Sequence, residues 1–174
     1  MPFNQLKEYP GLLEILHLSE YERNKSLKGI FKRDIEDNQH FKYRGKPIFP
    51  VKKDGQPTME TLFAHLITVE DKDNGEKNTP KTRSFDPDRS MRLHWIKHHI
   101  EKDNVTIFSY EDRIRGKSII RTYIYDKEQK YVIILEPRKE GIELYYLITA
   151  YYLNEKRGLN QIKSKIKNKL DEVY

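Results

Sequence analysis

YYLITAYYL, at residues 145–153, is the stretch that decides the fold of this chain. Its large aromatic and aliphatic side chains are typical of a strand, and side chains along a strand alternate between the two faces of a sheet. We therefore expect every second residue from Leu144 to Ala150 to pack in a core. Thr149 and Tyr151 should then lie on the other face, which presents phenols and a hydroxyl.

Three alternating stretches precede this strand, at residues 105–110, 118–125 and 130–136, and short turns join all four. Such short links predict an antiparallel meander. The second stretch places Arg121 and Tyr123 on one face, which we expect to be open. An arginine in a strand is usually a surface salt-bridge partner, and alternating aromatics usually pack across strands. The alternative is that a guanidinium beside phenols and hydroxyls binds a phosphodiester.

Helical spacing dominates the chain before the strands. Pro10 opens an apolar run to Leu16, which predicts a first helix. Ser19 and Glu22 form a possible capping box for a second helix. A short third helix begins at Thr58.

Two further helices flank the strands. Asp86 and Pro87 predict the start of a helix over residues 87–101, with Asp as N-cap and Pro at the first helical position. Residues 160–174 form a basic amphipathic pattern, which predicts a closing helix. The expected fold class is therefore α+β, with N-terminal helices followed by a four-stranded antiparallel sheet and a C-terminal helix.

Two segments between the helices have a different character. Residues 41–51 alternate aromatics and cations around Arg44 and Gly45, which suits a short ribbon that its prolines keep at an edge. Residues 69–84 have almost no apolar content and predict a mobile loop or an ordered substrate lid. We divide the chain into a helical extension (1–68), a flexible loop (69–84) and an α+β domain (85–174), and we expect the domain to form one compact unit with the extension.

Composition narrows the classes of function. The chain has 174 residues, a formal net charge of +6 and no cysteine. The positive charge favours a polyanionic partner, because Lys and Arg gain from counterion release on nucleic acid. The lack of cysteine excludes disulfides, thiolate nucleophiles and Cys-ligated zinc. The sequence contains neither a signal peptide nor an apolar run long enough for a bilayer, so we expect a cytoplasmic protein without membrane contact.

RSMRLHWIKHHIE, at residues 89–101, contains three of the six histidines and the sole tryptophan. His94 and His98 lie one helical turn apart and could hold a metal. However, the segment lacks the Glu of the zinc-protease motif, and Lys97 opposes a cation, so we expect no metal and no cofactor. Two interpretations remain: the histidines are exposed or hydrogen-bonded residues of an amphipathic helix, or one of them is catalytic.

The order of RSMRLHWIKHHI, IIRTYIY, YVIILEP and YYLITAYYL, over roughly residues 85–155, resembles the phage-associated branch of the barnase/EndoU/colicin/RelE-like nuclease superfamily. Its members, with the BECR fold, are small helix-then-antiparallel-sheet domains that cleave RNA without metal, often as toxins or mobile-element proteins. The resemblance implies a catalytic set of His94 or His99, Arg121, Thr149 and Tyr151. The residues expected to bind substrate are Arg92, Arg115, Lys117 and Tyr123.

The leading hypothesis is a metal-independent endoribonuclease of prophage or toxin type. A histidine would take the 2′-hydroxyl proton, Arg121 would stabilise the phosphorane charge, and a second His or Tyr151 would protonate the leaving oxygen. The expected partners are RNA and a proteinaceous inhibitor or antitoxin. Arg89 and His94 also have the R-x4-H spacing of HEPN ribonucleases, but that fold is all-helical. The non-enzyme alternative is a nucleic-acid or protein-binding module with a degenerate nuclease fold.

Overall fold

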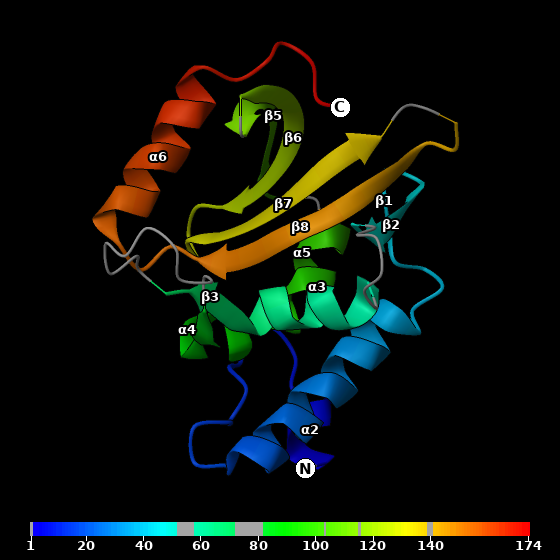
Figure 1. The fold of residues 1–174 in the computed structure, drawn as a ribbon, viewed down its shortest axis with the longest axis vertical. Coiled ribbons are helices and arrows are strands. Elements are labelled where there is room, and N and C mark those ends of the chain that lie inside the picture. The colour runs from blue at the N-terminus through cyan, green and yellow to red at the C-terminus, as the bar shows by residue number, and fades with distance from the viewer. Residues whose placement is uncertain (1, 52–57, 72–81, 103, 115, 139–140) are drawn as a thin grey trace.

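The computed structural model of the protein describes residues 2–51, 58–71, 82–102, 104–114, 116–138 and 141–174. In this part of the chain, helices and strands combine in a mixed α+β fold with a six-stranded sheet and a two-stranded sheet (Figure 1). The predicted α+β class is confirmed. The predicted sheet of four strands is wrong, because two strands from the N-terminal part of the chain join it.

Four consecutive strands form most of the larger sheet: β5 (Thr106–Ile114), β6 (Lys117–Asp126), β7 (Tyr131–Arg138) and β8 (Leu144–Tyr152). Each strand pairs antiparallel with the next. The predicted meander is therefore confirmed. Gly116 and Lys130 adopt positive φ values between these strands, as tight hairpin turns require.

Two short strands extend the meander: β1 (Lys42–Tyr43) and β2 (Lys46–Pro50). They form the predicted ribbon, and Arg44 and Gly45 in its turn have φ values of 50° and 77°. The sheet order is β1-β2-β8-β7-β6-β5, and β2 runs parallel to β8. The expectation that prolines keep this ribbon at an edge is wrong for β2, which lies inside the sheet. The residues of β2 alone do not indicate this pairing, because β8 lies almost 100 residues later in the chain.

A β-bulge in β8 changes the alternation of side chains between the two faces of the sheet. Ile134 pairs with Thr149 and Leu135 with Leu147, so Ile148 is an extra residue without a partner in β7. The core contains Tyr145 and Leu147 before the bulge and Ala150 after it. The expectation is wrong for Leu144 and Tyr146 before the bulge, whose side chains lie on the face opposite to the one expected. The inserted residue changes the alternation, so Ala150 after the bulge packs in this core as expected.

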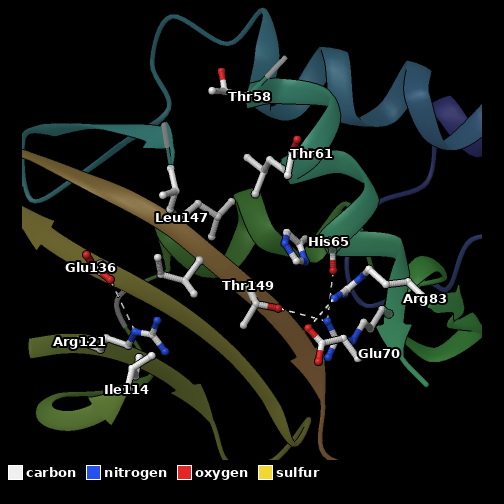
Figure 2. A pocket seen from close by; sticks show the side chains of 14 residues that line it. Thr58, Thr61, His65, Glu70, Arg83, Ile114, Arg121, Glu136, Leu147 and Thr149 are labelled. Carbon is white, nitrogen blue, oxygen red and sulfur yellow. Dashed lines mark hydrogen bonds and ion pairs between the residues drawn. The ribbon is translucent and has the colours of Figure 1, made fainter. Parts of the chain in front are cut away.

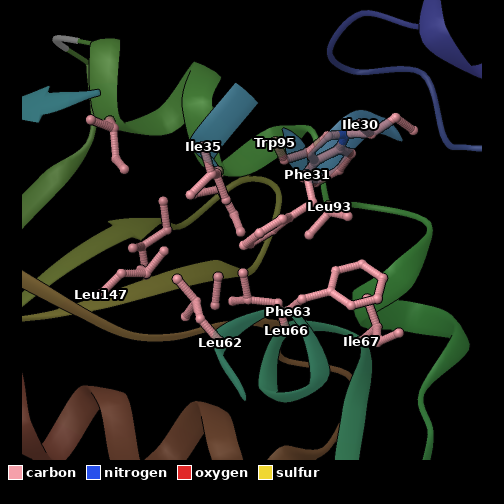
Figure 3. Close-up of a cluster of buried hydrophobic side chains, with 14 of the residues drawn as sticks. Ile30, Phe31, Ile35, Leu62, Phe63, Leu66, Ile67, Leu93, Trp95 and Leu147 are labelled. Atoms are coloured by element: carbon pink, nitrogen blue, oxygen red, sulfur yellow. The ribbon is translucent and has the colours of Figure 1, made fainter. Parts of the chain in front are cut away.

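The two faces of the sheet are covered differently. We call the face that carries Arg121 and Tyr123 the arginine face, and the face that carries Ile124 and Leu147 the helix face. Against the helix face packs a large apolar core (Figure 3). It includes side chains from the N-terminal helices, such as Leu27, so the described residues before β3 share a core with the sheet. A second core lies on the arginine face, where Ile162 of the C-terminal helix packs.

The N-terminal helices are α1 (Pro2–Gln5), α2 (Glu20–Phe31), the π-helix Lys32–Glu36 and α3 (Thr58–Ile67). Ser19 and Glu22 form the predicted capping box of α2. The helix predicted up to Leu16 is wrong: Leu13 and Ile15 are buried while Glu14 between them is exposed, so the segment alternates like an extended chain.

The predicted helix over residues 87–101 is divided into α4 (Pro87–Ser90) and α5 (Trp95–Glu101). Asp86 caps α4 and Pro87 is its first residue, as expected. Between the helices, Leu93 and Trp95 donate backbone hydrogen bonds three residues back instead of four, and the Met91 carbonyl accepts from Leu13. This tighter winding separates the two helices, so the continuous helix is a wrong prediction.

The predicted loop over residues 69–84 is wrong at its ends. Thr68–Glu70 forms β3 and Arg83–Phe85 forms β4, and the two strands pair antiparallel. Residues 72–81 lie outside the described residues. The prediction of a flexible loop is therefore not addressed for most of this segment.

The C-terminal helix, α6, spans Lys156–Lys167, earlier in the chain than predicted. It lies beside β5 and β6 (Figure 1). The backbone N–H of Leu170 donates to the carbonyl of Ser109 at 2.8 Å, so the chain beyond α6 returns to the sheet instead of extending the helix. No helix in the described part of the chain is long and apolar enough to cross a membrane.

Candidate active site

A cleft of about 570 Å³ lies along β8, between α3 and strands β6 to β8. Arginine-face residues such as Thr149 line it together with Leu147 of the helix face. The cleft brings together two residues of the predicted site, Arg121 and Thr149 (Figure 2). Five further charged or ionisable side chains join them from five other elements. These are His65 of α3, Glu70 of β3, Arg83 of β4, Arg89 of α4 and Glu136 of β7.

Arg89 lies at the wall of this cleft and is held by several oxygens. Its Nη1 donates to the hydroxyl of Thr149 and to the carbonyl of His65, each at 3.2 Å. Its Nε lies 3.2 Å from a carboxylate oxygen of Asp86, the residue that caps α4. Burial lowers the pKa of the Arg89 guanidinium below its usual value, yet arginine at neutral pH remains a cation. The Thr149 hydroxyl of β8 therefore helps to position the half-buried guanidinium of Arg89.

Arg121 reaches the cleft from β6. The register of β6 and β7 places it beside Glu136, and its Nε lies 3.7 Å from that carboxylate. Within the described residues this Nε has no hydrogen-bond partner, although the atom is buried. Glu136 partly offsets the charge of Arg121, whose guanidinium lines the cleft as a cation.

Arg83 is the third arginine of the cleft. Its Nε donates to the Thr68 hydroxyl at 2.8 Å, and its Nη2 donates to the Thr68 carbonyl at 2.9 Å. Its Nη1 lies 3.5 Å from Glu70. These contacts stiffen the β3–β4 hairpin and place a cation at the rim. The cleft is thus suited to an anionic ligand.

Neither predicted catalytic histidine reaches this cleft. His94 Nε2 lies 2.8 Å from the carbonyl oxygen of Gly11, and the side chain is only 5% exposed. His99 Nδ1 lies 2.8 Å from the Trp95 carbonyl, and Nε2 lies 3.1 Å from Asp126. Both rings lie on the helix face, where they support α5. The expectation that a histidine of residues 89–101 faces Arg121 and Thr149 is therefore wrong.

His65 is the histidine that lines the cleft instead, and its imidazole points toward Thr149 and Leu147 (Figure 2). It lies on α3, whose buried side chains are all apolar. The sequence contained one signal for it, because His65 interrupts the apolar run from Leu62 to Ile67. This signal is weak, since an isolated histidine in an apolar helix is most often structural. His65 was therefore not among the predicted site residues.

The other predicted residues are dispersed. Tyr151 lies beside Arg89, with the guanidinium carbon 5.4 Å from the ring centre, and it lines a neighbouring hollow that also contains Arg89. Arg92 pairs with Asp88 and stacks over Tyr152 at 4.0 Å, away from the cleft. Lys117 is exposed at the start of β6. Arg115 lies outside the described residues.

Tyr123 is not available to a substrate. It is 2% exposed, its hydroxyl donates to Asp112, and Lys165 of α6 donates to that hydroxyl at 2.9 Å. Burial raises the pKa of this phenol, and the nearby Asp112 raises it further. The predicted open face is therefore closed over Tyr123, because α6 covers this part of the arginine face.

Tyr123→Phe is expected to lower the free energy of unfolding by about 1 kcal/mol, because it removes the hydroxyl shared by Asp112 and Lys165 and keeps the ring. Urea denaturation measures this change. Tyr21→Phe is the matched control, since Tyr21 is 75% exposed. Equal urea midpoints for Tyr123→Phe and the unsubstituted protein would contradict a stabilising role of this hydroxyl.

Among the described residues, no group of three or more His, Asp or Glu side chains could hold a metal ion. Comparison with protein-family models gave no match, and comparisons with curated proteins and with solved structures gave none either. The resemblance to the nuclease superfamily therefore stays a prediction.

Proposed function

We propose that this protein is a metal-independent endoribonuclease that cleaves RNA by attack of a 2′-hydroxyl on the adjacent phosphodiester. The observation that carries the proposal is that His65, Arg89, Arg121 and Thr149 all line one cleft. Cationic groups on both walls suit a phosphate, and an imidazole suits proton transfer near neutral pH.

Each residue has a proposed role in this reaction. The His65 imidazole takes the proton of the 2′-hydroxyl, whose oxygen then attacks phosphorus. Arg89 and Arg121 stabilise the negative charge that grows on the phosphorane oxygens. The bond from phosphorus to the 5′-oxygen breaks, and an acid protonates that oxygen. The products are a 2′,3′-cyclic phosphate and a free 5′-hydroxyl.

Tyr151 and Glu136 are the two candidates for the acid. Tyr151 borders Arg89, and Glu136 pairs with Arg121, so each lies next to a phosphate-binding cation. Burial raises the pKa of Tyr151, which keeps the phenol protonated. We favour Tyr151 because it enters the reaction with its proton. A prophage or toxin origin, a cytoplasmic location and a protein inhibitor are proposed on the sequence resemblance.

The test is incubation of the purified protein with single-stranded RNA in the presence and absence of EDTA. We expect cleavage in both cases, with 2′,3′-cyclic phosphate ends, and no cleavage of the matching DNA strand, which lacks the 2′-hydroxyl. Loss of cleavage in EDTA, or cleavage of the DNA, would contradict this mechanism. Binding of RNA without any cleavage would support the non-catalytic binding module.

A further inference from the structure

A second hollow, of about 600 Å³, adjoins the cleft on the arginine face. Thr58 at the start of α3 lines both. The side chains of the second hollow differ from those of the first, since they are mainly aromatic and aliphatic with one cation. They include Phe49, Arg138, Ile142, Leu144 and Tyr146.

Phe49 and Tyr146 stand side by side in this hollow. They are register partners in the parallel pair of β2 and β8, so their side chains point to the same face. Phe49 is 46% exposed although its neighbours Ile48 and Pro50 are buried. Ile142, at the same end of β8, is 78% exposed. A protein rarely leaves large apolar side chains together in water without a binding role.

Arg138 adds a cation to this apolar surface. Its Nη1 donates to the Tyr146 hydroxyl at 2.6 Å, and its guanidinium carbon lies 5.9 Å from the Tyr146 ring centre. The side chain itself is exposed. The hydrogen bond fixes the orientation of the phenol ring, and the remaining N–H groups of the guanidinium can reach a phosphate.

The strand β8 connects this surface to the cleft. Tyr146 lines the second hollow and Ile148 lines the cleft, and two residues span about 7 Å along a strand. The β-bulge at Ile148 lets both Ile148 and the following Thr149 line the cleft. A chain of nucleotides could therefore pass from the arginines of the cleft to the aromatic pair without leaving the arginine face.

We propose that Phe49, Tyr146 and Arg138 form a subsite that stacks an unpaired base of the nucleotide next to the one in the cleft, so that the substrate class is single-stranded RNA. This inference rests on the proposed function. The aromatic rings supply the stacking surface, and Arg138 contacts the backbone phosphate. A duplex cannot use the subsite, because its bases already stack on one another.

The test uses an RNA oligonucleotide of mixed sequence with 2′-O-methyl riboses, which cannot be cleaved by 2′-hydroxyl attack. Phe49→Ala is expected to weaken its binding about 5- to 150-fold, the range found when one stacking side chain is removed. Phe49→Trp is expected to keep the affinity and to show quenched fluorescence when the oligonucleotide binds. Tyr21→Ala is the matched control, because Tyr21 is an exposed aromatic on α2.

A series of oligonucleotides that lack one base at successive positions locates the contact. If Phe49 stacks on a base, one member of the series binds the unsubstituted protein and Phe49→Ala with equal affinity. Equal loss of affinity on Phe49→Ala across all members would overturn the stacking role, and so would a duplex that binds as tightly as the single strand.

The outcomes separate the two proposals. Cleavage of unmodified RNA together with no effect of Phe49→Ala on affinity would overturn the subsite and leave the ribonuclease. Absence of cleavage together with binding that depends on Phe49 would overturn the ribonuclease and leave the subsite. A protein that neither binds nor cleaves single-stranded RNA would overturn both.

Discussion

His65→Ala protein is expected to cleave RNA about 100 to 10,000 times more slowly than the unsubstituted protein, which is the usual effect of losing a general base. His65 lines the cleft with Arg89 and Arg121, whereas His94 and His99 are engaged on the opposite face of the sheet. The measurement is the initial rate of cleavage of a labelled single-stranded RNA. The cleavage rate of the variant should no longer rise with pH on the acidic side of the profile, because that rise reflects deprotonation of the base.

Two controls make this prediction specific. His17→Ala replaces an exposed histidine outside the cleft and should leave the rate unchanged. Added imidazole should restore part of the activity of His65→Ala, because a cleft that loses its imidazole can admit a free one. A His65→Ala protein with the full rate and an unaltered pH profile would remove His65 from the mechanism.

His99→Ala protein that is folded but does not cleave RNA, together with fully active His65→Ala protein, would contradict His65 as the base. The base would then be a histidine of residues 89–101, as predicted from the sequence. Circular dichroism distinguishes this from unfolding. The distinction matters because His99 is 1% exposed and holds Asp126, so its replacement disturbs the core.

Acidification is expected to destabilise the fold, and His94 accounts for about 3 kcal/mol of this loss. Burial lowers the pKa of His94 from 6.5 to about 4. Between these pH values the unfolded chain binds a proton that the folded chain excludes. Stability that is present above pH 6.5 is therefore lost progressively as the pH falls toward 4, at about 1.4 kcal/mol per pH unit.

Urea denaturation at a series of pH values from 7 to 4 measures this dependence. His94→Gln should flatten the decline of unfolding free energy in this window, because glutamine does not titrate. His17→Gln is the control and should retain the slope, since His17 is exposed. Parallel declines for the unsubstituted protein and His94→Gln would show that other groups cause the acid sensitivity.

Features with a short sequence range could be predicted from the chain alone. The meander from β5 to β8 was predictable because alternation and turn residues act between neighbours in sequence. The capping box at Ser19 and the N-cap at Asp86 were predictable for the same reason, since each involves residues three apart. The fold class and the strand position of Arg121 and Thr149 followed from these local patterns.

Features that depend on distant contacts could not be predicted. β2 joins β8 through backbone pairing between segments far apart in the chain, and the bulge at Ile148 depends on the register with β7. The alternation of side chains predicts two faces of a strand. It does not reveal an inserted residue, after which the side chains lie on the opposite faces. The break before α5 also depends on a distant contact, because the backbone N–H of Leu13 donates a hydrogen bond to the Met91 carbonyl.

The sequence by itself determined that Arg121 and Thr149 lie on neighbouring parts of a meander, because strand periodicity and short turns leave few alternatives. Only the tertiary structure decided which histidine joins them. The packing of α5 on the helix face buries His94 and His99, while α3 packs against β8 and brings His65 to the cleft. The position of a helix depends on the fit of many apolar side chains at once. The spacing of residues within one helix therefore does not predict where that helix packs.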